Sequence, residues 1–365
     1  MFVFKNTPFI HFFVHMFYYV FHFEKIYILI IYFLLLMNIL AVYLKEIHYK
    51  KVGNKDVEVR KTNFTDKRIV ETLRSLGHNV DWLEYDKSKL RSVRGKYDLI
   101  FNLADGLEND NEFQEIPILK NIEKTGIPYT GNSSKAIKSC YDKANIKRIL
   151  LKNGVSTPDF QIFRKYSQKL KKDLGFPLIV KPLYTDGGVG ITDKSVVYNE
   201  KQFRKQVKKC IVENNQPALI EEYIVGRDFC VPVIGRRAFS PMECTFSSKV
   251  FKNRPKIMTY DVKWAGESNK DYHYTYFILR DKLNRNYSGE LDKKIKSAAE
   301  KAFKVMGCTA YGTVDIRTNN KEDVFVIEVN PNCWIDKYSD TFKSVKSQGY
   351  SYPEFIEKII KLNKK

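Results

Sequence analysis

The sequence predicts an α/β (α+β) protein whose first part holds a parallel sheet and whose second part is largely antiparallel. From Met37 to about residue 135, short apolar runs alternate with amphipathic segments, and such a succession gives right-handed βαβ units. From about residue 217 onward, several apolar runs follow one another with only turns between them, which favours antiparallel pairing. The 365 residues, 44% of them hydrophobic, allow roughly two or three domains.

The first part of the chain is predicted as three strands and two helices, followed by a short strand. The helix over 65–76 places apolar residues on one face, with Thr65 as its N-cap and Gly77 as its end. In a second helix, Pro117 fits only near the start or at a kink. The expected strands are 38–44, 78–86, 96–103 and 126–131, and the expected helices are 65–76 and 112–125.

The rest of the chain continues with mixed elements. We expect an amphipathic helix over 136–154 that Gly154 ends, and a closing helix over 351–362 with Phe355, Ile356, Ile359 and Ile360 facing inward. A strand pair over 217–235 turns at Val225–Gly226, and another pair turns at Asn319–Asn320. The remaining predictions are strand, glycine loop and strand over 174–191, helices over 200–214 and 293–307, and antiparallel strands within 237–280.

The N-terminal extension differs from the rest of the chain. Residues 1–44 carry only Lys5, Glu24 and Lys25 as charges, and residues 26–44 are nearly all apolar, about the length of a bilayer span. An anchor running through Leu44 would, however, consume the first strand of the sheet. We therefore favour Met37 as the functional start and a cytoplasmic protein, with residues 1–36 as an anchor or translated upstream sequence. A protein held in the membrane through residues 1–44 is the alternative.

Charge and cysteine content exclude some classes of function. The net charge of +20 comes from Lys and Arg spread over the whole chain after Lys45, without a basic tail or a nucleic-acid-binding motif. The expected partners are therefore small molecules, without nucleic acid. The six cysteines form no CxxC pair, which favours reduced thiols over a zinc ribbon or a redox site.

Three oxygen-bearing side chains near the C-terminus form a candidate cation site. Asp315 lies in one apolar strand, whereas Glu328 and Asn330 lie in the next and share a face because side chains alternate along a strand. A turn at Asn319–Asn320 brings Asp315 close to Glu328. Two carboxylates and one amide oxygen suit Mg²⁺ with bound phosphates. The same residues also fit the exposed polar face of a two-sided sheet.

Two further motifs could bind a nucleotide. Lys181 ends a strand and is followed by Gly187, Gly188 and Gly190, whose backbone N–H groups can approach phosphates closely. The spacing excludes the P-loop and the Rossmann fingerprint, and a flexible hairpin also fits. In LIEEYIVGRDF, the carboxylates that flank the turn could take an amino group or ribose hydroxyls, or belong to a charged hairpin. Either Lys143 or Lys263, taken alone, also reads as a solvated lysine.

Taken together and in order, these motifs resemble the ATP-grasp superfamily, most closely proteins related to D-alanine–D-alanine ligase. The matching stretches run from FNLADGL through GIPYTGNSSKAIKSCYDKANIKRILLKNGVSTP, FPLIVKP, DGGVG, ALIEEYIVGRDF, TYDVKW and YGTVDI to VIEVNPN. The resemblance implies an ATP-grasp fold divided into a pre-ATP-grasp domain over 37–135, a central subdomain over 136–222 and a C-terminal subdomain over 223–365. It also implies an ATP-dependent carboxylate–amine ligase that forms an acyl-phosphate. Its substrates would be a small carboxylate and a small amine, and it allows a homodimer.

The resemblance assigns roles residue by residue. Lys143 and Lys181 would hold the phosphates of ATP, and Lys263 would reach the γ-phosphate. The loop with Asp186, Gly187, Gly188 and Gly190 would close over them. The adenine would lie against Glu221, Glu222, Tyr223 and Ile224, and Asp228 would bind the ribose. Asp315, Glu328 and Asn330 would hold one or two Mg²⁺ ions, or Mn²⁺.

Departures from the family pattern concern the substrate. Thr313 stands where the family's ligases carry an arginine that stabilises the tetrahedral intermediate, and Arg317 is our candidate replacement. Trp334 follows the metal asparagine where those ligases have a turn of small residues. We therefore expect intact ATP and Mg²⁺ binding with a substrate other than D-alanine. The alternative is an ATP-binding module without ligase turnover.

Overall fold

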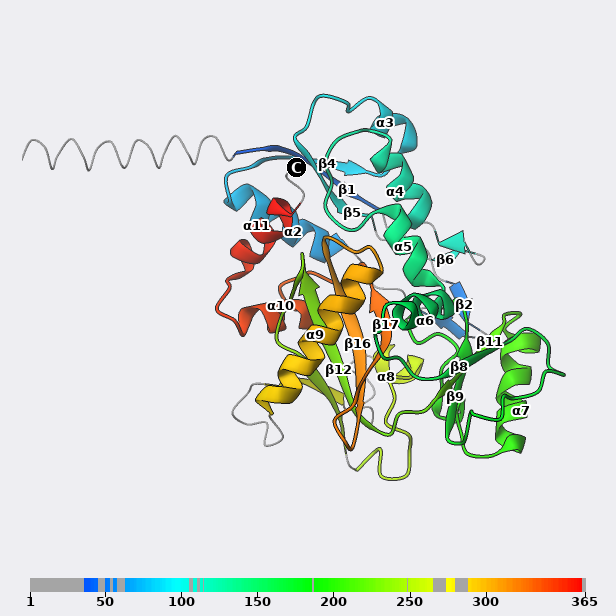
Figure 1. The fold of residues 1–365 in the computed structure, drawn as a ribbon. Helices are drawn as coiled ribbons and strands as arrows, with labels where there is room; N and C mark the ends of the chain where they lie inside the picture. Colours follow the sequence, from blue (N-terminus) through cyan, green and yellow to red (C-terminus); the bar gives the residue numbers. More distant parts are fainter. Residues whose placement is uncertain are drawn as a thin grey trace, which may run out of the picture.

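The computed structural model describes the chain in ranges: 36–44, 50–52, 55–57, 63–104, 108–109, 112–113, 115–185, 187–247, 249–264, 274–279 and 288–362. Three sheets dominate these ranges, a parallel sheet near the N-terminus and two antiparallel sheets farther along the chain. Figure 1 shows the parallel sheet at one end of the molecule and the two antiparallel sheets side by side below it.

The N-terminal sheet is parallel, as predicted, with the strand order β4-β1-β5. Its strands are β1 (Asn38–Tyr43), β4 (Asn79–Glu84) and β5 (Leu99–Leu103). The helices beside it are α2 (Asn63–Ser75), α3 (Lys87–Arg91) and α4 (Glu115–Glu123). Two short hairpins accompany them, β2 (Lys50–Val52) with β3 (Lys55–Val57), and β6 (Glu108–Asn109) with β7 (Glu112–Phe113).

Two predictions about this sheet need correction. Helix α2 begins at Asn63, so Thr65 lies inside its first turn and is not its N-cap. Residues 126–131 contribute only an isolated parallel bridge between Ile100 and Tyr129, not a strand. Pro117 lies near the start of α4, where its missing N–H leaves no gap in the helix.

The predicted helix over 136–154 is broken in two. The backbone of Asp142 is extended, and its side chain accepts hydrogen bonds from the N–H groups of Ala144 and Asn145. It therefore ends α5 (Ser134–Tyr141) and caps α6 (Lys143–Lys152). The amphipathic pattern runs across the break, which is why it predicted one helix.

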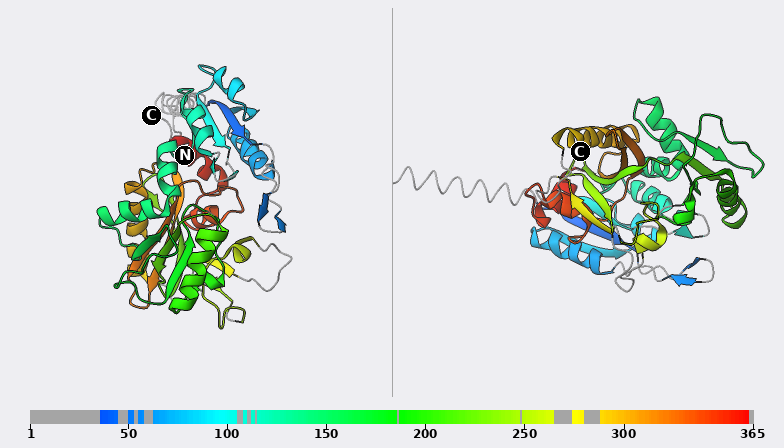
Figure 2. Two further views of the ribbon diagram at one scale, coloured as in Figure 1. Left: turned by 90° about the vertical axis from the view of Figure 1, so that its right-hand side faces the viewer. Right: turned by 90° about the horizontal axis from the view of Figure 1, so that it is seen from below.

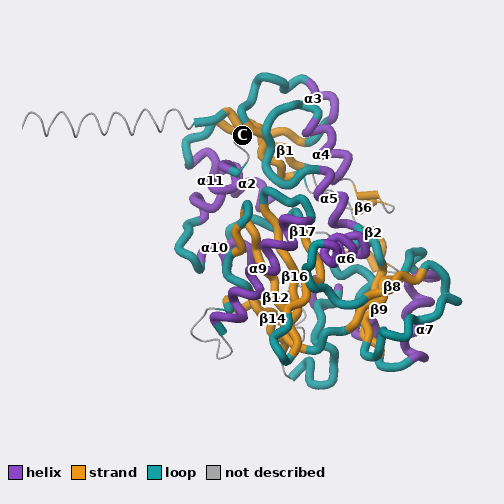
Figure 3. Tube along the Cα trace, in the orientation of Figure 1, coloured by secondary structure: helices purple, strands orange, loops and turns teal. Residues whose placement is uncertain are grey.

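The predicted central subdomain contains a four-stranded antiparallel sheet with the order β10-β9-β11-β8. Helix α7 covers the face that carries Phe163, Val180 and Ile220, whereas the other face turns toward α6. Figure 3 shows this sheet, with α7 beyond it, at one edge of the molecule. Its elements are β8 (Phe160–Phe163), β9 (Leu178–Pro182), η1 (Asp193–Ser195), β10 (Val196–Val197), α7 (Glu200–Lys208), η2 (Lys209–Glu213) and β11 (Ala218–Glu222).

The largest sheet is antiparallel and has the order β15-β14-β12-β16-β17, with β13 beside β12. The predicted strand pair over 217–235 is wrong, because β11 and β12 belong to different sheets. The turn at Asn319–Asn320 is confirmed. The elements are β12 (Gly226–Ile234), β13 (Arg237–Ala238), β14 (Met242–Phe246), α8 (Tyr260–Trp264), β15 (Tyr274–Ile278), α9 (Gly289–Val305), β16 (Tyr311–Asn319) and β17 (Val324–Asn330).

The chain ends with α10 (Asp340–Lys346) and α11 (Tyr352–Lys361), and α11 returns to the N-terminal sheet. All four predicted inward residues of α11 are at most 1% exposed. They share one core with β1, β5 and α2, and the views of Figure 2 agree that α11 lies beside α2. The predicted boundaries at 37–135, 136–222 and 223–365 stay predictions.

No helix within the described ranges is long and apolar enough to cross a bilayer. The predicted extension over 1–36 lies outside the described residues, apart from Leu36. All six cysteines are free thiols, as predicted.

Candidate active site

The candidate cation residues lie on one face of the β16–β17 pair. Asp315 is in register with Glu328, and Thr313 is in register with Asn330. Residues directly opposite each other in an antiparallel pair point to the same face, so these side chains form a single polar patch. The apolar partners on the other face, Val314 and Val329, are buried under α9 and α6.

The donor chemistry of this patch fits a hard divalent cation. It offers two carboxylates and one amide oxygen, the ligand type that Mg²⁺ takes together with substrate phosphates. No group of three His, Cys, Asp or Glu side chains that could hold a metal occurs among the residues that the structure describes, and the predicted set has only two carboxylates beside the amide of Asn330. All three residues are partly exposed to solvent.

Lys143 faces this patch from the neighbouring subdomain. Its ammonium lies 3.2 Å from the carboxylate of Glu328 and also donates to the backbone carbonyl of Thr185, at the start of the glycine loop. The helix break at Asp142 makes Lys143 the first residue of α6. A lysine that is 6% exposed therefore joins the cation residues to the loop predicted to cover the phosphates.

Lys181 belongs to a buried cluster of charges. The carboxylate of Glu221 pairs with Lys181 through one oxygen and with Lys147 through the other. The side chain of Lys147 is fully buried, and it also donates to the hydroxyl of Thr157 at 2.9 Å. Sequence reasoning missed Lys147, although its position one helical turn after Lys143 was a usable signal.

The charges in this cluster shift one another's pKa values. Burial raises the pKa of Glu221, but the ammonium groups of Lys147 and Lys181 more than offset it and hold the pKa at about 2. Burial lowers the pKa of Lys147, and Glu221 opposes that effect. Glu221 is therefore an anion that keeps two lysines in place beside the candidate phosphate site.

The predicted adenine and ribose segment connects the two antiparallel sheets. Glu222 is exposed, and the backbone N–H of Tyr223 donates to the carbonyl of Pro177. Ile224 is buried. Burial raises the pKa of Asp228, and the adjacent Arg317 opposes that rise.

Arg317 lies against this segment. Its guanidinium donates to the carbonyl of Ile224 at 3.0 Å and pairs with Asp228 at 3.1 Å. It also donates to the carbonyl of Lys256 at 2.9 Å and lies 5.2 Å from the ring centre of Tyr223. These contacts direct the guanidinium toward the candidate nucleotide segment.

The glycine loop and α8 are neighbours. Gly187, Gly188 and Gly190 all have positive φ angles, which glycine adopts without strain. A side chain at Gly188 would come within 3.2 Å of the backbone nitrogen of Tyr260, the first residue of α8. Lys263 lies on the same short helix and is exposed. Asp186 lies outside the described residues.

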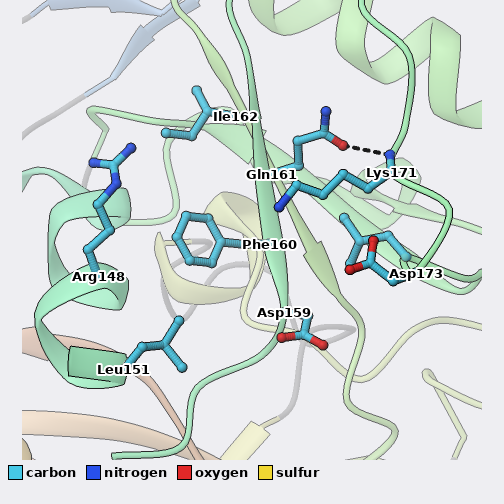
Figure 4. A pocket seen from close by; sticks show the side chains of 9 residues that line it. Arg148, Leu151, Asp159, Phe160, Gln161, Ile162, Lys171 and Asp173 are labelled. Carbon is cyan, nitrogen blue, oxygen red and sulfur yellow. Dashed lines mark hydrogen bonds between the residues drawn. The ribbon is translucent and has the colours of Figure 1, made fainter. Parts of the chain in front are cut away.

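A shallow pocket of about 330 Å³ lies elsewhere, between α6 and the edge strand β8. Figure 4 shows Arg148 and Leu151 on one side of it and Lys171 and Asp173 on the other. None of the predicted site residues lines it. It is therefore separate from the candidate active site.

A family comparison decides the relationship. Residues 149–361 match the family model described as the D-ala D-ala ligase C-terminus. The chain belongs to the D-alanine–D-alanine ligase family. The expected resemblance and the ATP-grasp fold are confirmed. ATP and Mg²⁺ are the cofactors of this family, and ATP-dependent ligation is the activity of the family.

Similar sequences and similar solved structures also come from the D-alanine–D-alanine ligase family. A D-alanine–D-alanine ligase of Fervidobacterium nodosum is 27% identical over 81% of this chain and 92% of its own length. An uncharacterised protein of Sinorhizobium fredii is 25% identical over 80% and 85%. The Bacillus anthracis D-alanine–D-alanine ligase complexed with ATP has a TM-score of 0.66 at 20% identity, covering 90% of this chain and 97% of that one. The VanG D-Ala:D-Ser ligase of Enterococcus faecalis has the same TM-score at 19% identity, covering 89% and 99%.

Proposed function

We propose that this protein is an ATP-dependent carboxylate–amine ligase that activates its carboxylate substrate as an acyl-phosphate and has a substrate other than D-alanine. The observation that carries the proposal is the cation patch of Asp315, Glu328 and Asn330 opposite Lys143. Phosphoryl transfer to a carboxylate needs neutralised charge and correct positioning more than a protein nucleophile. Cytoplasmic location and a homodimer remain part of the same proposal.

Each residue of the site has a proposed role. Asp315, Glu328 and Asn330 would hold one or two Mg²⁺ ions, or Mn²⁺, and the cation would neutralise charge on the phosphates. Lys143 and Lys181, both buried, would bind the phosphate oxygens. The remaining members of the proposed site are Lys263 toward the γ-phosphate, the loop with Asp186, Gly187, Gly188 and Gly190 as a cover, Glu221, Glu222, Tyr223 and Ile224 at the adenine, and Asp228 at the ribose.

A water-excluding cover would protect the acyl-phosphate until the amine attacks. The amine then forms the C–N bond, and phosphate leaves with the electron pair of the broken C–O bond. The proton lost by the amine passes to solvent or to the departing phosphate.

A module that binds ATP without turnover is the second candidate. Thr313 occupies the position of the family's arginine and is 7% exposed, in register with Asn330. Trp334 is 47% exposed in the segment after β17. Thr313 changes the surroundings of the cation patch, where a ligase would hold its reacting carboxylate, and Trp334 changes the segment that follows Asn330 in the chain.

An acceptor screen separates the two candidates. The full chain is incubated with Mg-ATP and a panel of amino acids and dipeptides that includes D-alanine, while ADP release and product mass are measured. A ligase with a different substrate gives ADP and a condensed product with an acceptor other than D-alanine. Tight ATP binding without turnover across the panel would favour the binding module.

The contacts of Arg317 predict its kinetic role. We expect Arg317→Met to raise the KM for ATP about tenfold with little change in kcat, because the guanidinium orders Asp228 and the carbonyl of Ile224. Steady-state rates of ADP release at varied ATP measure both constants. A large fall in kcat at unchanged KM would instead support Arg317 as the substitute for the missing family arginine.

A further inference from the structure

Three segments of the chain meet at one buried carboxylate, that of Glu115. Glu115 is the first residue of α4 and is 5% exposed. The hydroxyl of Tyr141, the last residue of α5, donates to one of its oxygens. The side-chain amide of Asn332, two residues after β17 ends, donates to the other at 2.6 Å.

Tyr141 and Asn332, the two partners named above, are each connected to a residue of the candidate active site. The backbone N–H of Asn332 donates to the Oδ1 atom of Asn330 at 3.2 Å. Tyr141 directly precedes Asp142, the residue that caps α6 and so fixes Lys143 at the start of that helix. Glu115 therefore holds the segments that present one expected cation ligand and one expected phosphate lysine.

The hydrogen bond to Asn330 is compatible with cation binding. An amide oxygen has two lone pairs, so one can accept the N–H of Asn332 while the other faces a metal ion. The bond sets the direction in which the Oδ1 atom points. Groups that orient metal ligands in this way typically contribute 10- to 100-fold to metal affinity or activity.

We propose that Glu115 is a positioning residue for the cation site, acting through Asn332 on Asn330. The inference rests on the proposed function, because it needs Asn330 to meet the cation. It predicts that removing the charge of Glu115 weakens Mg²⁺ binding beside the nucleotide and leaves the protein's own contacts with the nucleotide intact.

Helix α4 supplies a matched control at its other end. Glu123 is also a partly buried carboxylate on this helix, and it accepts hydrogen bonds from the hydroxyl of Tyr129 at 2.9 Å and from the backbone N–H of Ser134 at 2.8 Å. Glu123 also accepts from the hydroxyl of Ser134, and these hydrogen bonds of Tyr129 and Ser134 are made to Glu123 rather than to Asn330 or Asn332. Glu123→Gln therefore reports the purely structural cost of such a change.

The experiment measures ADP binding by calorimetry at increasing Mg²⁺ concentrations, so it needs no knowledge of the acceptor. We expect Glu115→Gln to raise the Mg²⁺ concentration needed for half-maximal enhancement of ADP affinity about tenfold, with metal-free ADP affinity unchanged. Glu123→Gln should match the wild type. Asn332→Ala, which removes the side-chain donor and keeps the backbone N–H, should repeat the shift and serves if Glu115→Gln does not fold.

Equal Mg²⁺ dependence in wild type, Glu115→Gln and Asn332→Ala would overturn the positioning role and leave the proposed function standing. A parallel loss in Glu115→Gln and Glu123→Gln would also overturn it, since the effect would then be structural. If the ADP affinity of the wild type does not depend on Mg²⁺, the proposed function is wrong, and the inference fails with it.

Discussion

Changing Glu328 to glutamine should lower Mg²⁺-dependent turnover of ATP by about 10²- to 10³-fold, the effect of losing one well-placed electrostatic contact in an active site. Glu328 is in register with Asp315 and lies 3.2 Å from the ammonium of Lys143. The substitution removes one of the two charges that the cation patch offers and the anionic partner of Lys143. Under the proposed function, both losses would act on the phosphates of ATP.

Rates of ADP formation at varied Mg²⁺ measure this effect. Asp323→Asn is the control, because Asp323 is an exposed carboxylate of the same hairpin, located at its turn. We expect that variant to behave as wild type. Unchanged kinetics in Glu328→Gln would show that Glu328 does not act as a cation ligand.

Changing Glu221 to glutamine should lower the free energy of unfolding by about 3 to 5 kcal/mol at neutral pH. Glu221 is 1% exposed and pairs with two lysines, one of them fully buried. Removing one partner of a buried ion pair leaves the remaining charge without compensation in a medium that solvates it poorly. Urea unfolding of both proteins at pH 7 gives the difference.

The ion pairs of Glu221 also predict how the stability of the protein depends on pH. The pKa of Glu221 is about 2 in the folded chain, below the 4.5 of the free group, so the stability it contributes is fully present above about pH 4.5. That contribution is lost as the pH falls toward 2. The stability difference between wild type and Glu221→Gln should therefore narrow over this window.

Glu200→Gln is the control for the stability prediction. Glu200 pairs with Arg204 at 2.6 Å in the same subdomain, but its side chain is 57% exposed. Surface pairs of this kind contribute about 0 to 1 kcal/mol, so this variant should stay within that range of the wild type. A loss for Glu221→Gln that is no larger than this would show that the Glu221 cluster is not a buried ion pair in solution.

The shared face of Glu328 and Asn330 was predictable because side chains alternate along a strand. The turn at Asn319–Asn320 does not by itself set the pairing of Asp315 with Glu328. From the turn, Thr318 pairs with Val324 and Ile316 with Val326, and a bulge between Asp315 and Ile316 then shifts the register so that Asp315 lies opposite Glu328. The inward face of α11 was predictable because it depends only on helical periodicity.

Other features depend on contacts between segments that are distant in the sequence. Strand alternation placed Arg317 on the same face as Asp315. Its partners, however, come from β12 and from Lys256, and no local sequence signal identifies them. The break at Asp142 was missed because its cap competes with an uninterrupted amphipathic pattern. Whether β11 and β12 pair depends on their neighbours in two different sheets, so a short turn between them was a misleading signal.

Helix α11 completes the core of the N-terminal sheet, and this has a consequence for synthesis on the ribosome. Ile39 and Phe101 emerge early, whereas Phe355 and Ile359, which pack in the same core, emerge among the last residues of this sequence. The parallel sheet and α2 cannot complete this core until α11, residues Tyr352–Lys361, has been translated. The nascent polypeptide must therefore carry an exposed apolar surface past both later subdomains, and this is the interval in which chaperones would be most useful.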